Sequence, residues 1–181
     1  MEITEALALV EKIIEEHRQI THGFQTLEQV ANDVGAMQGL EVGSEAFMPG
    51  RFDQGQGLEK LAESLETIEQ GLQAHFNREE TSLPTAVETY GTEELVSALR
   101  SLLQAHENLR NRLAHSKRSI AELTGGGLSR HVWEASAHDM RAYLSHTRKL
   151  LEAHAMSEEK LLHKLRDWLL EETKEKRLDI M

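Results

Sequence analysis

Residues 75–80 read HFNREE, and residues 154–159 repeat the pattern as HAMSEE. In the first run Glu79 follows His75 by four residues, about one helical turn, so both side chains lie on one face if the segment is helical. Histidine nitrogens and carboxylate oxygens that project from facing helices can hold a metal ion in the core of a bundle. The two runs therefore indicate a helical fold with a buried metal site.

The apolar residues around these runs recur with the helical period in four long segments. We expect these segments to form helices at residues 4–33, 58–83, 93–123 and 128–174. Pro84 should end the second helix, Thr92 should cap the third, and glycines 125–127 should make the turn before the fourth. With short connections between neighbours, this pattern predicts an all-α fold, an up-down-up-down four-helix bundle.

The length of the chain favours a single domain over residues 1–181. Residues 34–57 interrupt the helical pattern with six glycines and one proline. Because this stretch is longer than an ordinary connection in a bundle, we expect a glycine-rich loop or insertion between the first two helices. Residues 171–181 are rich in charge and are expected to form a solvated C-terminal tail with a fraying helix end.

The composition excludes several classes of partner and site. With 20 basic and 31 acidic side chains, the net charge of −11 repels nucleic acid and anionic membranes. The chain has no cysteine, so any metal must be held by nitrogen and oxygen atoms. No segment approaches the roughly 18 apolar residues of a membrane span. The N-terminus lacks the features of a signal peptide, so we expect a cytoplasmic protein.

Four histidines project onto the apolar face when the predicted helices are drawn at about 100° per residue. There is one in each helix: His17, His75, His106 and His154. Glu79 and Glu158 project onto the same faces, whereas Glu80 and Glu159 project toward solvent. At about 1.5 Å per residue, the levels of the four histidines along an up-down bundle differ by some 15 Å at most, and ragged helix ends can absorb much of this difference. The residues can therefore share one layer.

With residues 16–18 (EHR), 83–84 (LP) and 106–110 (HENLR), the two runs resemble the hemerythrin-like (HHE cation-binding) domain over essentially the whole chain. The resemblance implies a four-helix bundle around a non-haem diiron centre with an oxo or hydroxo bridge. It implies four nitrogen ligands and two bridging carboxylates: His17, His75, His106, His154, Glu79 and Glu158. Each iron would keep a position open to dioxygen, peroxide or nitric oxide. Zinc or manganese can substitute at such a site.

Arg110 marks a departure from the oxygen-carrying members that the chain resembles. Those proteins place a second histidine one turn after the first on the third helix, and Arg110 occupies the corresponding position here. The centre then has one histidine ligand fewer, and the positively charged guanidinium of Arg110 is expected near it. This difference weakens the expectation of reversible dioxygen carriage and favours redox, nitric oxide or iron-related roles.

Two classes of function remain open from the sequence. The first is a diiron protein that binds or senses dioxygen, nitric oxide or iron without turnover. The second is an enzyme that reduces peroxide or nitric oxide, or oxidises ferrous iron. An enzyme acting on peroxide needs a proton donor beside the metals. The inward candidates are Thr21, Arg110 and Thr147, none of which is a convincing acid, so the sequence favours binding.

Overall fold

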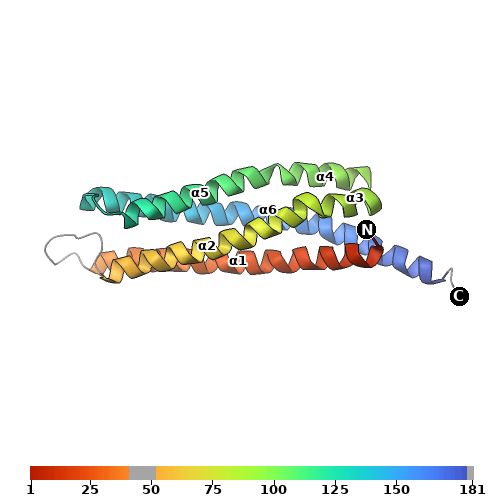
Figure 1. Cartoon of the computed structure of the whole chain (residues 1–181), viewed down its shortest axis with the longest axis horizontal. Coiled ribbons are helices and arrows are strands. Elements are labelled where there is room, and N and C mark those ends of the chain that lie inside the picture. The colour runs from red at the N-terminus through yellow and green to blue at the C-terminus, as the bar shows by residue number, and fades with distance from the viewer. Residues whose placement is uncertain (41–51, 179–181) are drawn as a thin grey trace. The chain divides into compact units, whose positions relative to one another are not determined.

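The computed structural model describes residues 1–40 and 52–178, and the regular secondary structure within them is entirely helical (Figure 1). Its elements are α1 (Ile3–Leu40), α2 (Phe52–Thr81), α3 (Leu83–Tyr90), α4 (Glu93–Leu103), α5 (Ala105–Thr124) and α6 (Arg130–Leu178). The expectation of an all-α fold is confirmed. No helix in these described ranges is long and apolar enough to cross a membrane.

The boundaries of the predicted glycine-rich loop, residues 34–57, were wrong at both ends. Helix α1 continues through Gly35 and Gly39, and α2 already begins at Phe52. A glycine inside a helix costs only about 1 kcal/mol, and extending an existing helix is far easier than starting one. Glycines therefore did not stop these helices. Residues 41–51, the centre of the predicted loop, lie outside the described residues.

Other helix ends also differ from the prediction. Pro84 does not simply end a helix, because it lies in the first turn of α3, where its missing N–H has no partner to lose. The predicted helix at residues 93–123 is divided at Gln104 into α4 and α5. Helix α6 continues to Leu178 through most of the predicted fraying tail, and residues 179–181 of that tail lie outside the described part.

Two predicted turn and cap positions are confirmed. The Thr92 hydroxyl oxygen accepts a hydrogen bond from the Leu95 backbone N–H at 3.3 Å, as an N-cap of α4 should. Gly126 and Gly127 have φ values of 74° and 83° in the turn between α5 and α6. This left-handed conformation is open to glycine and costly for other residues, so the turn requires glycine at these positions.

The chain divides into two compact units. The first contains Met1–Ile20, Gly71–Asn108 and the part of α6 from Leu151 onward. The second contains Thr21–Gln70 and Leu109–Leu150.

An apolar core fills the first unit. Its buried members come from α1, α3, α4 and α6: Ile3, Ala6, Val10, Ile13, Ile14, Leu83, Ala86, Val87, Leu95, Leu99, Leu161, Leu162, Leu165 and Leu169. Tyr90, at the end of α3, donates its phenolic hydrogen to the Met1 carbonyl at 2.7 Å, and Figure 1 shows α3 and α4 beside the N-terminus. Because this core fixes the stretches of α1 and α6 that it includes, it also fixes His17 and Glu158, which lie about one turn from its residues Ile14 and Leu161.

The second unit has buried apolar residues of its own, of which Trp133 is the largest. The indole ring is 1% exposed, and its N–H donates to the Leu123 carbonyl at 3.0 Å. Buried apolar residues of the same unit include Phe24, Leu27, Leu61, Leu65, Leu113 and Leu144. A buried indole with its single donor satisfied is a stable core arrangement.

The cap of α4 provides a test of the fold. Replacing Thr92 by alanine should lower the free energy of unfolding by about 1 kcal/mol, because the Leu95 N–H loses its partner. Urea denaturation measures this difference. Thr89→Ala is the matched control, since the Thr89 hydroxyl donates a hydrogen bond to the Thr85 carbonyl within its own helix and caps no helix end. Equal stability of the two variants would contradict the assignment of Thr92 as a cap.

Candidate metal centre

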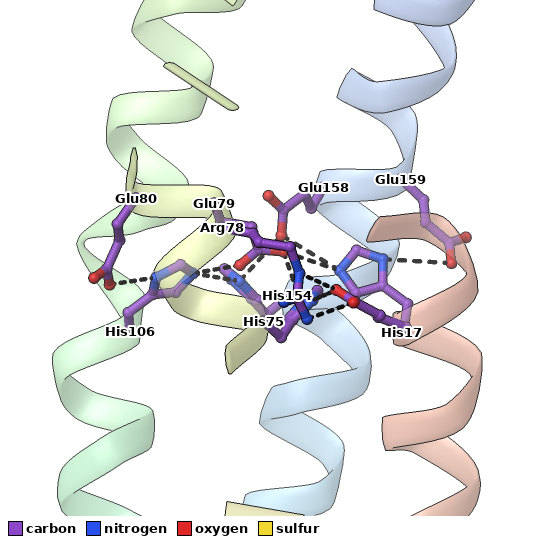
Figure 2. Close-up of polar contacts among 10 residues, drawn as sticks. His17, His75, Arg78, Glu79, Glu80, His106, His154, Glu158 and Glu159 are labelled. Carbon is purple, nitrogen blue, oxygen red and sulfur yellow. Dashed lines mark hydrogen bonds and ion pairs between the residues drawn. The ribbon is translucent and has the colours of Figure 1, made fainter. Parts of the chain in front are cut away.

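Four stretches of helix in the first unit place their histidines and glutamates around one point (Figure 2). All six residues that the sequence selected are brought together there and are buried: His17 from α1, His75 and Glu79 from α2, His106 from α5, and His154 and Glu158 from α6. Glu79 and Glu158 are 0% exposed. Helical periodicity therefore selected the correct inward side chains on every contributing helix.

Glu79 contacts histidines from three helices through its two oxygens. Its Oε1 lies 2.7 Å from His75 Nε2 and 3.5 Å from His17 Nε2, whereas its Oε2 lies 3.2 Å from His106 Nε2. The two oxygens of one carboxylate thus face different sets of histidines. This is the orientation needed by a carboxylate that spans two cations.

Glu158 contacts histidines from two helices. Its Oε2 lies 3.5 Å from His17 Nε2 and 3.4 Å from His154 Nε2. The Nε2 atoms of His106 and His154 are themselves only 3.1 Å apart. Two nitrogens at that distance fit adjacent ligands of one cation, because a bond of about 2.1 Å to each leaves an angle near a right angle between them.

The ligand atoms fall into two overlapping groups of four. One contains His17, His75, Glu79 and Glu158, and the other contains His106, His154 and the same two glutamates. Within each group the ligand atoms lie within 4.8 Å of one another. The two groups share both carboxylates, so the residues offer two neighbouring cation positions.

Several of these buried polar atoms have no hydrogen-bond partner of acceptable geometry. They are both ring nitrogens of His17 and both carboxylate oxygens of Glu79 and of Glu158. Buried polar atoms in folded proteins are nearly always paired, and an unpaired buried charge costs several kcal/mol. A cation bound between the carboxylates and the imidazoles would satisfy the four carboxylate oxygens and His17 Nε2, whereas His17 Nδ1 faces outward toward Glu159. The donor set therefore fits a metal.

The charges of the centre depend on one another. Burial alone would lower the pKa of His17, but the Glu158 and Glu79 carboxylates outweigh it and raise that pKa to about 9. Burial alone would raise the pKa of Glu79, but His106, His17 and His75 outweigh it and lower that pKa. Similarly, Glu79 and Glu80 raise the pKa of His106 against the effect of burial. Without metal, protons on His17 and His106 supply positive charge beside the carboxylates.

Phe76 forms an apolar wall of the centre, a role that the sequence analysis missed. It is 1% exposed, and its ring stacks on His106 with 4.1 Å between centroids and 18° between planes. The ring also lies edge-on to His154, with centroids 6.4 Å apart. Phe76 therefore packs against two imidazole rings of the centre and restricts the orientation of the His106 ring.

Glu80 and Glu159 were expected to be solvated in preference to contacting the histidines of the centre, and the structure shows that they do both. They are 34% and 33% exposed, and they face the outer ring nitrogens of His106 and His17 at 2.9 Å and 3.7 Å. Glu16, which the sequence analysis did not select, lies 3.1 Å from His75 Nδ1. Projection on a single helix could not find these contacts. Each carboxylate lies off the inward face of its own helix and contacts a histidine on a neighbouring helix.

A scan against protein-family models matches residues 8–166 to a model described as the hemerythrin HHE cation-binding domain. The corresponding searches of curated proteins and of solved structures give no match. The family match covers most of the chain and includes all six residues of the centre.

The raised pKa of His17 predicts how stability depends on pH in metal-free protein. An unfolded histidine has a pKa near 6.5, whereas that of folded His17 is about 9. Its contribution is therefore fully present below pH 6.5 and is lost as the pH rises to 9. The lowered pKa of Glu79 adds stability that is lost in acid. Melting temperatures measured with a chelator should thus fall between pH 6.5 and 9.

The His17→Gln variant is the control for this measurement, because it removes the titrating ring. Its melting temperature should decline less steeply over the same range. A wild-type melting temperature that stays constant or rises from pH 6.5 to 9 would contradict the assignment.

Proposed function

We propose, because this chain belongs to the hemerythrin HHE cation-binding domain family, that its buried centre holds a pair of non-haem iron ions and binds or senses a small diatomic ligand. The observation that carries this proposal is the sharing of Glu79 and Glu158 by two groups of histidines. One cation would lie with His17 and His75, and the other with His106 and His154. Both glutamates would bridge them.

Iron suits the donor set because imidazole nitrogens and carboxylate oxygens form a mixed field that accepts it, although zinc and manganese can bind similar ligands. When bound, an iron pair supplies reversible electron exchange and coordination positions for a diatomic molecule such as dioxygen or nitric oxide. The chain itself supplies six ligands and, in Phe76, an apolar wall.

The burial of the centre supports a small ligand. None of the six residues is more than 8% exposed. A molecule that reaches the cations must pass between packed helices, which a diatomic ligand can do far more easily than a larger substrate. We therefore place dioxygen or nitric oxide ahead of any organic substrate.

The proposal includes the arrangement of the whole chain as one hemerythrin-like domain, with α1, α2, α5 and α6 as an up-down-up-down four-helix bundle. The family match supports this arrangement because it continues across segments of both compact units. Each of these four helices also has residues in both units.

We favour binding over catalytic turnover because one candidate proton donor, the Thr147 hydroxyl, already donates its hydrogen to another group. The Thr147 hydroxyl donates to the Tyr143 carbonyl at 2.8 Å and accepts from Arg112 Nε at 3.0 Å. The hydroxyl hydrogen is therefore already donated to a backbone carbonyl of the same helix, α6. A hydroxyl held in this way is a poor source of protons for peroxide reduction.

Metal analysis tests the proposed centre. Protein produced with iron should contain about two irons per chain, as a two-metal site requires. Glu158→Ala should lose most of this iron because both cations lose a bridging ligand. His22→Ala is the control, since His22 is an exposed histidine on α1, and it should keep the wild-type iron content. Equal iron in all three proteins would refute the assignment.

Stopped-flow absorbance separates binding from turnover. Reduced, iron-loaded protein mixed with dioxygen or nitric oxide should develop one stable absorption band, with about one ligand taken up per metal pair. The same protein mixed with excess peroxide should not consume it repeatedly. Rapid multiple turnover of peroxide or nitric oxide would instead establish an enzyme.

A further inference from the structure

Three of the six residues of the centre, His17, Glu79 and Glu158, have a neighbouring glutamate in the sequence that faces a histidine on a different helix. Glu16 precedes His17 on α1 and contacts His75 on α2. Glu80 follows Glu79 on α2 and contacts His106 on α5. The outer carboxylates thus connect neighbouring helices around the centre, as Figure 2 shows for Glu80 and His106.

Glu16 is held in place by Arg78. Its Oε2 accepts a hydrogen bond from Arg78 Nε at 3.0 Å and lies 3.1 Å from His75 Nδ1, while its Oε1 pairs with Arg78 Nη2. The carboxylate is only 15% exposed, so it is partly removed from water and fixed at both oxygens. Two parallel contacts to a guanidinium set the orientation of a carboxylate firmly.

Glu80 occupies the equivalent position beside His106. Its Oε1 lies 2.9 Å from His106 Nδ1, and the other nitrogen of that ring, Nε2, faces Glu79 and His154. The His106 ring is further fixed by the stacked Phe76. Both ring nitrogens of His106 therefore have defined and different surroundings.

A neutral imidazole has one nitrogen that donates and one that accepts. A carboxylate at Nδ1 favours the tautomer in which Nδ1 carries the hydrogen, since a carboxylate can only accept. The lone pair is then on Nε2, which faces the proposed cations. We propose that Glu16 and Glu80 are positioning residues that fix the Nδ1–H tautomer and the ring orientation of His75 and His106. This inference rests on the proposed function.

Glu159 provides an internal comparison. It faces His17 Nδ1 at 3.7 Å, beyond the range of a hydrogen bond, and His17 Nδ1 has no hydrogen-bond partner among the described residues. Its effect on metal binding should accordingly be smaller than that of Glu16 or Glu80.

Zinc affinity of the metal-free, full-length protein tests the inference. Glu16→Gln and Glu80→Gln should each bind Zn²⁺ about 10- to 100-fold more weakly than wild type, the usual effect of removing an outer partner of a ligand histidine. Glu15→Gln is the matched control, because Glu15 is an exposed neighbour of Glu16 that pairs only with Arg18 in the described structure. It should bind as wild type does. Glu16→Asp keeps the negatively charged carboxylate, which glutamine lacks, and should recover part of the loss.

Proton and nitrogen NMR of the zinc-loaded proteins separates positioning from general stability. In wild type the Nδ1–H hydrogens of His75 and His106 should appear downfield and exchange slowly, because each is donated to a carboxylate. Glu16→Gln should shift and broaden the His75 signal while leaving that of His106 unchanged, and Glu80→Gln should do the reverse. A merely structural role would not produce this selectivity.

The possible failures are distinguishable. If wild type and Glu15→Gln bind no Zn²⁺, the proposed function fails and the inference fails with it. If both bind two zinc ions and the Glu16 and Glu80 variants bind equally well, with unchanged Nδ1–H signals, only the inference is overturned. If Glu16→Gln does not fold, Arg78→Gln releases the same carboxylate and should weaken zinc binding in the same direction.

Discussion

The burial of two carboxylates among four imidazoles is the constraint on which the rest of this structure depends. Glu79 and Glu158 are fully buried, and their oxygens have no satisfactory hydrogen-bond partners. Taking such charges out of water is affordable only when positive charge is close by. Protonated histidines can supply that charge in the metal-free protein, and two cations can supply it more completely. The family match and the geometry thus lead to the same centre.

The apolar packing serves this arrangement. Ile14 lies about one turn before His17, and Leu161 lies about one turn after Glu158, so the core of the first unit holds two ligand-bearing helices in register. Phe76 closes one side of the centre against His106. Because packed side chains already hold these histidines and glutamates together, cations that bind there would need little reorganisation of the chain.

The sequence correctly predicted which histidines and glutamates face inward, because these side chains obey the period of a single helix. A four-residue spacing selected Glu79 over Glu80, and the structure brings Glu79 into the centre. The same reasoning missed the outer carboxylates, since the contact of Glu16 with His75 depends on how two helices pack. Some helix ends were also mispredicted, because glycines were interpreted as helix breakers. Extending a long helix by one residue is easy, and it overcame the low helix propensity of these glycines.

The most direct test of the central claim is an anomalous difference map from crystals of iron-loaded protein, measured at the iron absorption edge. Two peaks about 3.5–4 Å apart are expected, as in other two-metal sites. One should lie beside His17 and His75, the other beside His106 and His154, with both glutamates between them. A single peak, or iron bound elsewhere while the glutamates remain free, would contradict a centre built on two shared carboxylates.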